Sequence, residues 1–173
     1  MDEQGQIDNA AMEWARLLPD LDVVTMRTAL LFARVSALGR RHVEAAFSGV
    51  GLSAGEFDVL ASLMHAPDRT SKPSVLARNG MLSPAGMTHR LDLLEKAGLV
   101  ERQPDPDDRR SILVVLTQAG ATKAIEAARA HVAAEAEIFD ALDSSDQADL
   151  RRLLEMLLDT VTPAAPDPVD LHR

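Results

Sequence analysis

The chain has 173 residues, of which 46% are hydrophobic and only 3% aromatic, and its formal net charge at pH 7 is −9. It contains no cysteine, which excludes disulfides, thiolate nucleophiles and cysteine-ligated zinc. The overall acidity argues against indiscriminate binding of nucleic acid. No apolar run approaches the roughly 18 residues of a membrane span, and the acidic beginning MDEQGQIDNA is unlike a signal peptide. We therefore expect a cytoplasmic protein with no membrane partner.

The positive charge is concentrated in the middle of the chain. Residues 72–112 hold seven Lys or Arg against six Asp or Glu, whereas the remaining residues hold 11 against 21. The middle segment is therefore where a polyanion would dock.

Helices are predicted in the first part of the chain. After an unstructured N-terminus over residues 1–9, residues 10–18 are predicted to form a short helix that contains Trp14 and is ended by Pro19. A longer helix is predicted from about residue 23 to residue 47, because apolar residues recur there at helical spacing.

Three further helices are predicted in the middle of the chain. The first opens on the capping box Ser53-Ala54-Gly55-Glu56 and ends before Pro67. The second begins at Pro73, a residue that is tolerated in a first helical turn. The third is capped by Ser83 and closed by Gly98, and the tight turn before it makes the last two helices a helix-turn-helix.

A β-hairpin is predicted directly after these helices. Residues 99–102 and 111–116 are strand-like, and residues 104–108 between them are rich in turn formers. A hairpin in this position is the wing of a winged helix-turn-helix.

The last part of the chain is predicted to be helical again. Thr117 is expected to cap a long Ala-rich helix to about Leu142, and Ser144 or Ser145 to cap a final helix with a broad apolar stripe. Residues 163–173 have the composition of a disordered tail.

The predicted fold is therefore mainly α with a small β-hairpin wing. The winged helix-turn-helix lobe is assigned to residues 52–116. Residues 10–51 hold an N-terminal extension helix and a first dimerisation helix, and residues 117–162 hold the C-terminal dimerisation helices.

Residues 82–120, LSPAGMTHRLDLLEKAGLVERQPDPDDRRSILVVLTQAG, resemble the MarR family of bacterial transcription factors. The specific features are Gly-Leu-Val after the helix-turn-helix, a wing that ends Asp-x-Arg, and the helix start Leu-Thr-x-x-Gly. The resemblance extends over about residues 22–160. It implies a transcriptional regulator, expected to be a repressor, that binds a pseudo-palindromic operator in double-stranded DNA as a homodimer. No cofactor is expected.

The helix after Ser83 would present its outer face to the major groove, and its first turn can hold a phosphate. In the wing, Arg110 is expected to enter the minor groove, with Asp108 holding its guanidinium by a charged hydrogen bond. Arg109 is expected to meet a phosphate, with a solvated turn residue as the equal alternative. The residues predicted to contact DNA are Ser83, Pro84, Ala85, Thr88, His89, Arg90, Asp108, Arg109 and Arg110.

The chain is also similar to the urate-responsive branch of the family, which carries an extra N-terminal helix. That similarity implies a ligand site of Trp14, Asp58, Arg90 and Arg102. Trp14 would stack on a planar purine, Arg102 would neutralise its charge, and Asp58 would accept from a ring N–H or be displaced. The effector is accordingly expected to be urate or another small aromatic anion. The alternative is that each of these side chains has a structural or phosphate-binding role alone.

Two other functions stay open from the sequence. One is a winged-helix adaptor that binds another protein through its acidic surface, and the other is a metal-responsive regulator of the same fold. The five histidines are too scattered to specify a metal site, so no metal ligand is assigned. Because no phosphate-binding loop or nucleophile motif occurs, the protein is not expected to be an enzyme.

Overall fold

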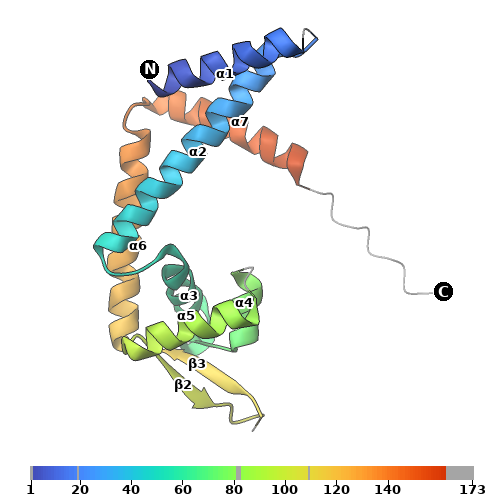
Figure 1. Ribbon diagram of the computed structural model, residues 1–173. Helices are drawn as coiled ribbons and strands as arrows, with labels where there is room; N and C mark the ends of the chain where they lie inside the picture. The colour runs from blue at the N-terminus through green and yellow to red at the C-terminus, as the bar shows by residue number, and fades with distance from the viewer. Residues whose placement is uncertain (1, 19, 81–82, 109, 163–173) are drawn as a thin grey trace, which may run out of the picture. The chain divides into compact units, whose positions relative to one another are not determined.

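The computed structural model describes residues 2–18, 20–80, 83–108 and 110–162 (Figure 1). The chain divides into two compact units, residues 1–135 and residues 136–173. Within the described ranges the elements in chain order are α1 (Glu3–Leu17), α2 (Val23–Gly49), α3 (Ala54–His65), the 3-10 helix η1 (Pro67–Arg69), β1 (Thr70–Ser71), α4 (Pro73–Asn79), α5 (Pro84–Lys96), β2 (Val100–Pro104), β3 (Ile112–Leu116), α6 (Gln118–Phe139) and α7 (Ser144–Val161). This confirms the mainly helical fold with a small sheet. None of the helices described is long and apolar enough to span a membrane.

Helix α1 begins earlier than the sequence indicated. The predicted unstructured segment over residues 1–9 is helical from Glu3, because Asp2 caps the helix by accepting from the Gly5 amide at 2.8 Å. Ion pairs from Glu3 and Asp8 to arginines of α2 tie this segment to its neighbour. These partners lie too far along the chain for a local pattern to indicate them. Pro19 and the predicted tail over residues 163–173 lie outside the described residues.

The sheet has three strands in the order β1-β3-β2, all antiparallel. Strands β2 and β3 form the predicted hairpin. The short strand β1 pairs with β3 through Thr70 opposite Val115 and Ser71 opposite Val114. The sequence did not predict β1, because two residues are too few to show the alternation of polar and apolar side chains that indicates a strand.

The core of the first unit lies between α3, α4, α5, the sheet and the start of α6. Met87, Leu91 and Leu94 are buried on one face of α5, as their spacing predicted. They pack with the buried side chains of α3 and of the two longer strands, namely Val59, Leu60, Leu63, Val100, Val114 and Leu116. The opposite face of α5 is consequently left at the surface.

The start of α6 is locked to the base of the wing. As predicted, Thr117 caps this helix: its Oγ1 accepts from the Gly120 amide at 2.9 Å and also donates to the Gly98 carbonyl at 2.8 Å. A Cβ at Gly120 would lie 2.0 Å from the Leu99 carbonyl oxygen, so this position requires glycine. The Leu-Thr-x-x-Gly pattern therefore serves the close approach of helix and hairpin.

The second unit contains the end of α6, at Phe139 rather than at the predicted Leu142, and helix α7. Asp143 caps α7 by accepting from the amides of Ser145 and Asp146 at 2.8 and 2.9 Å. The prediction that Ser144 or Ser145 caps it was wrong, because the carboxylate one position earlier reaches the same amides. The apolar side chains of α7 are exposed: Leu153, Leu154, Met156, Leu157, Leu158 and Val161.

Candidate nucleic-acid interface

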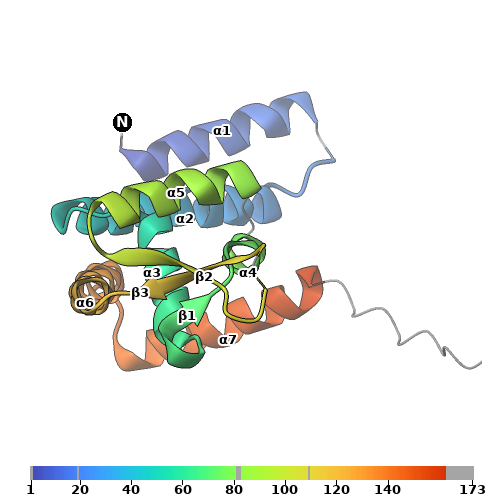
Figure 2. The ribbon, with the colours of Figure 1, turned by 90° about the horizontal axis from the view of Figure 1, so that it is seen from below.

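Helix α5 and the hairpin lie side by side, joined through Gly98, whose φ of 70° turns the chain from the helix into β2 (Figure 2). Ser83 caps α5 as predicted, its Oγ accepting from the Gly86 amide at 3.1 Å. Pro84 follows in the first turn. Because Pro84 has no N–H and the amides of Gly86 and Met87 both donate to Ser83, few amides of this turn are available to a phosphate.

The residues of α5 that lie outside its buried face fall on three sides. Successive residues of an α-helix are rotated by about 100°, so Ala85 and His89 point away from the buried face. Both are exposed. Thr88 lies on the flank nearer the wing, where its hydroxyl donates to the Pro84 carbonyl at 3.0 Å. Arg90 lies on the other flank, toward α3.

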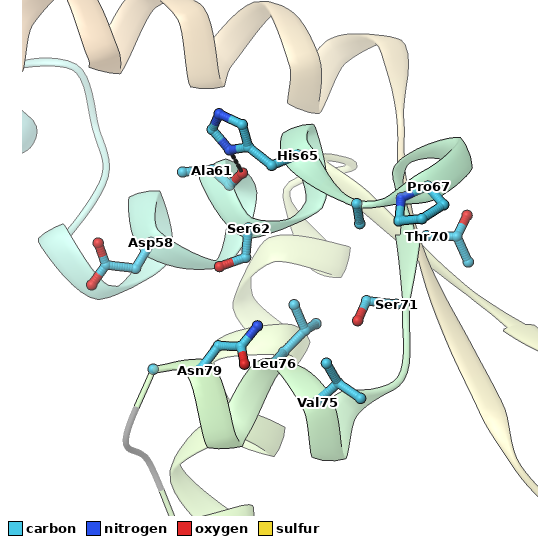
Figure 3. Close-up of a pocket in the computed structure, with 12 residues that line it drawn as sticks. Asp58, Ala61, Ser62, His65, Pro67, Thr70, Ser71, Val75, Leu76 and Asn79 are labelled. Atoms are coloured by element: carbon cyan, nitrogen blue, oxygen red, sulfur yellow. Dashed lines mark hydrogen bonds between the residues drawn. The ribbon is translucent and has the colours of Figure 1, made fainter. Parts of the chain in front are cut away.

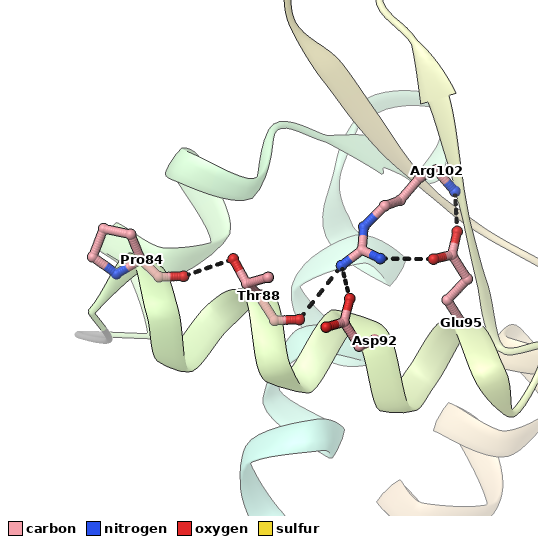
Figure 4. A network of polar contacts seen from close by, with 5 residues as sticks. All are labelled: Pro84, Thr88, Asp92, Glu95 and Arg102. Atoms are coloured by element: carbon pink, nitrogen blue, oxygen red, sulfur yellow. Dashed lines mark hydrogen bonds and ion pairs between the residues drawn. The ribbon is translucent and has the colours of Figure 1, made fainter.

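Arg102, at the base of the wing, is held by two carboxylates of α5 (Figure 4). Its guanidinium lies 2.7 Å from Asp92 Oδ1 and 2.7 Å from Glu95 Oε2. Its backbone N–H also donates to Glu95 Oε1 at 3.0 Å. Burial by itself would lower the pKa of Arg102, but the hydrogen bonds to Asp92 and Glu95 outweigh it and raise that pKa. The base of the wing is thereby clamped to α5.

Sequence reasoning did not identify Asp92 and Glu95 as the partners of Arg102. Both lie on the flank of α5 that faces the hairpin, one turn apart, and Arg102 follows on the adjacent strand. That spacing is the signal that could have indicated the contact.

Arg90 rests against the first turn of α3. A Cβ at Gly55 would lie 2.2 Å from Arg90 Cζ, so the absence of a side chain at Gly55 makes room for the guanidinium. Arg90 and Asp58 line the same small cavity of about 10 Å³, although no ion pair joins them in the described part of the chain. The structure thus brings together two of the four predicted ligand residues.

The other two predicted ligand residues lie elsewhere. Arg102 is on the opposite flank of α5 from Arg90, engaged by the two carboxylates. Trp14 is on α1, with 49% of its surface exposed. These two side chains are not among those that line the cavity shared by Asp58 and Arg90.

A larger cleft of about 760 Å³ lies between α3, β1 and α4. Figure 3 shows the polar side chains of Ser62, Ser71 and Asn79 around this space. Asp58 lies at one end of it. The described residues that line the cleft include this carboxylate and no Lys or Arg. The described lining of the cleft therefore supplies one carboxylate and no permanent positive charge.

In the wing, Asp108 contacts Arg110 in a different way from the one predicted. Asp108 Oδ1 accepts from the backbone N–H of Arg110 at 3.0 Å, and no ion pair joins the two side chains among the described residues. An aspartate in a turn reaches the amide two residues on more readily than a long side chain that extends into solvent. Arg110 is exposed. Arg109, the predicted phosphate contact, lies outside the described residues.

A further pair at the wing escaped sequence reasoning. Asp105 is only 5% exposed, and Lys72 Nζ lies 2.8 Å from its Oδ2. The hydrogen bond from Lys72, followed by the one from the Asp107 amide, lowers the pKa of Asp105. No local pattern could indicate this pair, because Lys72 stands before α4 and Asp105 after β2.

The described histidines do not gather into a metal site. No group of three or more potential ligands among His, Cys, Asp and Glu occurs in the described residues. His131 packs against Phe47 and Phe57, with ring centroids 5.2 and 5.8 Å away, and its Nε2 lies 3.1 Å from Glu135 Oε1. These are packing contacts on α6.

Comparison with known proteins gives concordant matches. A model of the MarR family matches residues 52–112. The HTH-type transcriptional regulator PecS of Dickeya dadantii (strain 3937) is 36% identical over 151 residues, which cover 86% of this chain and 90% of that protein. The HTH-type transcriptional repressor Rv2887 of Mycobacterium tuberculosis H37Rv is 35% identical over 127 residues, covering 73% and 90% of the two chains.

Solved structures of related transcriptional regulators have a similar fold. Rv2887 in complex with DNA has a TM-score of 0.61 at 32% identity, covering 75% of this chain and 95% of that one. Rv2887 in complex with salicylic acid has a TM-score of 0.58 at 34% identity, covering 75% and 94%. MarR from Escherichia coli, without ligand, has a TM-score of 0.66 at 29% identity, covering 74% and 93%. These proteins are transcriptional regulators and not enzymes, in agreement with the expectation from the sequence.

Proposed function

Because the chain belongs to the MarR family of DNA-binding transcriptional regulators, we propose that it is a repressor whose homodimer binds a pseudo-palindromic operator and leaves it when a small aromatic anion binds. The observation that carries the proposal is the pairing of an exposed recognition face on α5 with a wing clamped to that same helix. One relative, Rv2887, is a transcriptional repressor by name, and this supports the repressor role.

The DNA contacts follow from the exposed groups of α5 and the wing. We propose that Ala85, Thr88 and His89 meet base edges in the major groove while Ser83, Pro84 and Arg90 meet the backbone. Arg110 enters the minor groove, held by the backbone contact from Asp108. The solved complex of Rv2887 with DNA supports this use of the fold.

The test of this interface is salt-dependent binding to a duplex that carries the promoter of the gene encoding this chain. Arg110→Ala should weaken binding by about tenfold. The control is Arg129→Ala, which removes the same charge from an exposed position of α6. Equal losses in both variants would refute a specific role for the wing. Absence of any salt-dependent shift would instead favour the adaptor that binds another protein.

The homodimer is proposed from apolar surface on α1, α2 and α7. Each of these helices leaves large apolar side chains exposed, among them Trp14, Leu17, Phe32, Val35, Leu157 and Val161. A monomer rarely leaves so much apolar surface to water, and a second copy is the occupant that two-fold operator binding requires. Sedimentation equilibrium should give twice the mass of one chain. Leu157→Asp should give a monomer that has lost operator binding.

The effector is proposed to be urate or a related aromatic anion acting near Arg102. The complex of Rv2887 with salicylic acid supports an aromatic anion as the ligand class. An anion at Arg102 would compete with Asp92 and Glu95 for the guanidinium. If the anion displaced the two carboxylates from Arg102, the wing would be released from α5. The released wing would favour a geometry that cannot bind DNA.

Arg90 and Asp58 give a second route from ligand to α5. Because Arg90 rests on Gly55 and shares a small cavity with Asp58, displacement of the Asp58 carboxylate by an anion would change the field at Arg90. The resemblance to the urate-responsive branch assigns the aromatic face of the site to Trp14, although Trp14 does not line the cavity of Asp58 and Arg90 within one chain.

Titration of the protein–operator complex with urate and, separately, with salicylate tests the effector. We expect release by at least one of the two anions, weakened in Trp14→Ala and in Arg102→Ala. Met12→Ala, which alters another exposed apolar side chain of α1, is the matched control. No release at millimolar concentration of either anion, or release equal in all variants, would overturn this part of the proposal.

A further inference from the structure

The turn of the wing is fixed at its first residue by a buried charge. Both carboxylate oxygens of Asp105 are used: Oδ2 lies 2.8 Å from Lys72 Nζ, and Oδ1 accepts from the Asp107 amide at 3.0 Å. A carboxylate that is only 5% exposed needs such partners, because an unpaired buried charge is strongly unfavourable.

A chain of hydrogen bonds connects Asp105 to Arg110. The Asp105 amide donates to the Ser111 carbonyl at 3.1 Å, and the Ser111 amide donates to the Asp108 carbonyl at 2.8 Å. Asp108 in turn accepts from the Arg110 amide at 3.0 Å. These hydrogen bonds join the described residues of the turn to one another and to Asp105.

Lys72 joins this turn to the rest of the lobe. Strand β1 pairs with β3 only at Val114 and Val115, so the hairpin extends beyond it. Lys72 directly follows β1 and precedes α4, and its side chain reaches Asp105 at the far end of β2. The contact therefore links the start of the helix-turn-helix to the turn of the wing.

The charge of Lys72 is directed at the acids of the turn. The pKa of Lys72 is raised, first by its hydrogen bond to Asp105 and its attraction to that carboxylate, and further by Asp108 and Asp107. The Lys72 ammonium thus already has an acidic partner within hydrogen-bonding distance, with 44% of its side chain exposed. An effect of Lys72 on DNA binding through that partner would be indirect.

We propose that Lys72 is a positioning residue for DNA binding: its ion pair with Asp105 holds the turn of the wing, and with it Arg110, where the wing meets DNA. The inference rests on the proposed wing–DNA contact. It adds that an acidic residue in the wing promotes DNA binding through its geometry, against the sign of its charge.

Operator binding by four variants tests the proposal. Lys72→Met should lower affinity by a factor on the order of ten without changing the slope of log affinity against log salt. Asp105→Asn should also lower affinity, although it removes a negative charge. Lys72→Arg should retain most of the binding, and Lys72→Met combined with Asp105→Asn should lose less than the sum of the single losses.

The opposite mechanism makes different predictions. If Lys72 contacts a phosphate directly, Lys72→Met should reduce the salt slope by about one, and Asp105→Asn should leave affinity unchanged or raise it. Either of these results would overturn the proposal.

Hydrogen exchange of the free protein tests the positioning role of Lys72 without DNA. Lys72→Met should accelerate exchange of the amides of Asp105, Asp107 and Ser111, with those of Leu60 and Leu63 in the core unchanged. Unchanged exchange in the wing would refute the positioning role. Because this readout does not involve an operator, a failure of the proposed DNA contacts is distinguishable from a failure of this inference.

Discussion

Gly55 of α3 lies beneath the guanidinium of Arg90, at a point where a Cβ would come within 2.2 Å of Arg90 Cζ. The contact places one of the predicted DNA-binding and ligand-binding residues against the helix that precedes the helix-turn-helix. A substitution at Gly55 can therefore move Arg90 without altering Arg90 itself.

Gly55→Ala should displace Arg90 and weaken operator binding by about threefold to tenfold, or roughly 0.7–1.4 kcal/mol. The fold should survive, because the group that must move is the end of a flexible side chain and Ala favours a helix. Fluorescence anisotropy with an operator duplex measures the effect. Gly49→Ala is the matched control, since a Cβ there has nothing within 4 Å. Equal operator affinity of the two variants would show that the position of Arg90 does not affect DNA binding.

Release of Arg102 from its carboxylates should sensitise the protein to its effector. Asp92→Asn combined with Glu95→Gln removes both competitors for the guanidinium. Because the wing also loses its clamp to α5, the operator affinity without ligand should fall, and the anion concentration that releases half of the DNA should fall with it. Because both carboxylates are more than a third exposed, the free energy of unfolding should fall by only about 0.5–1 kcal/mol. An unchanged release midpoint would argue that the anion binds away from Arg102.

Acid should weaken the wing through Asp105. The hydrogen bond from Lys72, and after it the one from the Asp107 amide, holds the pKa of this carboxyl below the usual value of about 3.9. Since the folded pKa is below the unfolded one, the carboxylate contributes stability that is fully present above about pH 4 and is lost as the pH falls through the folded pKa.

Asp105→Asn should therefore flatten the decline of unfolding free energy below about pH 4. Denaturant titrations of wild type and variant across that range measure the difference. Among the described residues, the other carboxyls whose pKa is lowered are Glu3 and Asp22, which are present in both proteins, so their contributions cancel. Parallel declines in the two proteins would show that protonation of Asp105 does not contribute to the loss of unfolding free energy in acid.

Gly120→Ala should be strongly destabilising. The added Cβ would meet the Leu99 carbonyl oxygen at 2.0 Å, and a backbone atom cannot swing away as a side chain can. We expect a loss of about 1–3 kcal/mol or more, measured by thermal unfolding. Ala119→Ser, at an exposed neighbouring position, should have little effect. Equal midpoints in the two variants would contradict the close approach of α6 and the hairpin.

The helices could be predicted because their signals are local. The capping box at Ser53 and Glu56 is formed, Ser83 and Thr117 cap the helices that follow them, and Met87, Leu91 and Leu94 face the core. Each of these features depends on residues within about one helical turn of each other. The cap of α7 was misplaced because Asp143 reaches the amides that the following serines were expected to cap, and the start of α1 was misplaced because Asp2 caps the helix and distant arginines of α2 pair with it.

The sequence by itself determined the order of the helices and the hairpin of the winged helix-turn-helix, since periodicity, caps and turn residues act over a few positions, and its resemblance over residues 82–120 indicated the family. Only the tertiary structure decided which charged groups meet: Lys72 with Asp105, Arg102 with Asp92 and Glu95, and Arg90 with the bare backbone of Gly55. Those pairings join different elements, and a charge in a sequence carries no information about which opposite charge the packed core will bring within hydrogen-bonding distance of it.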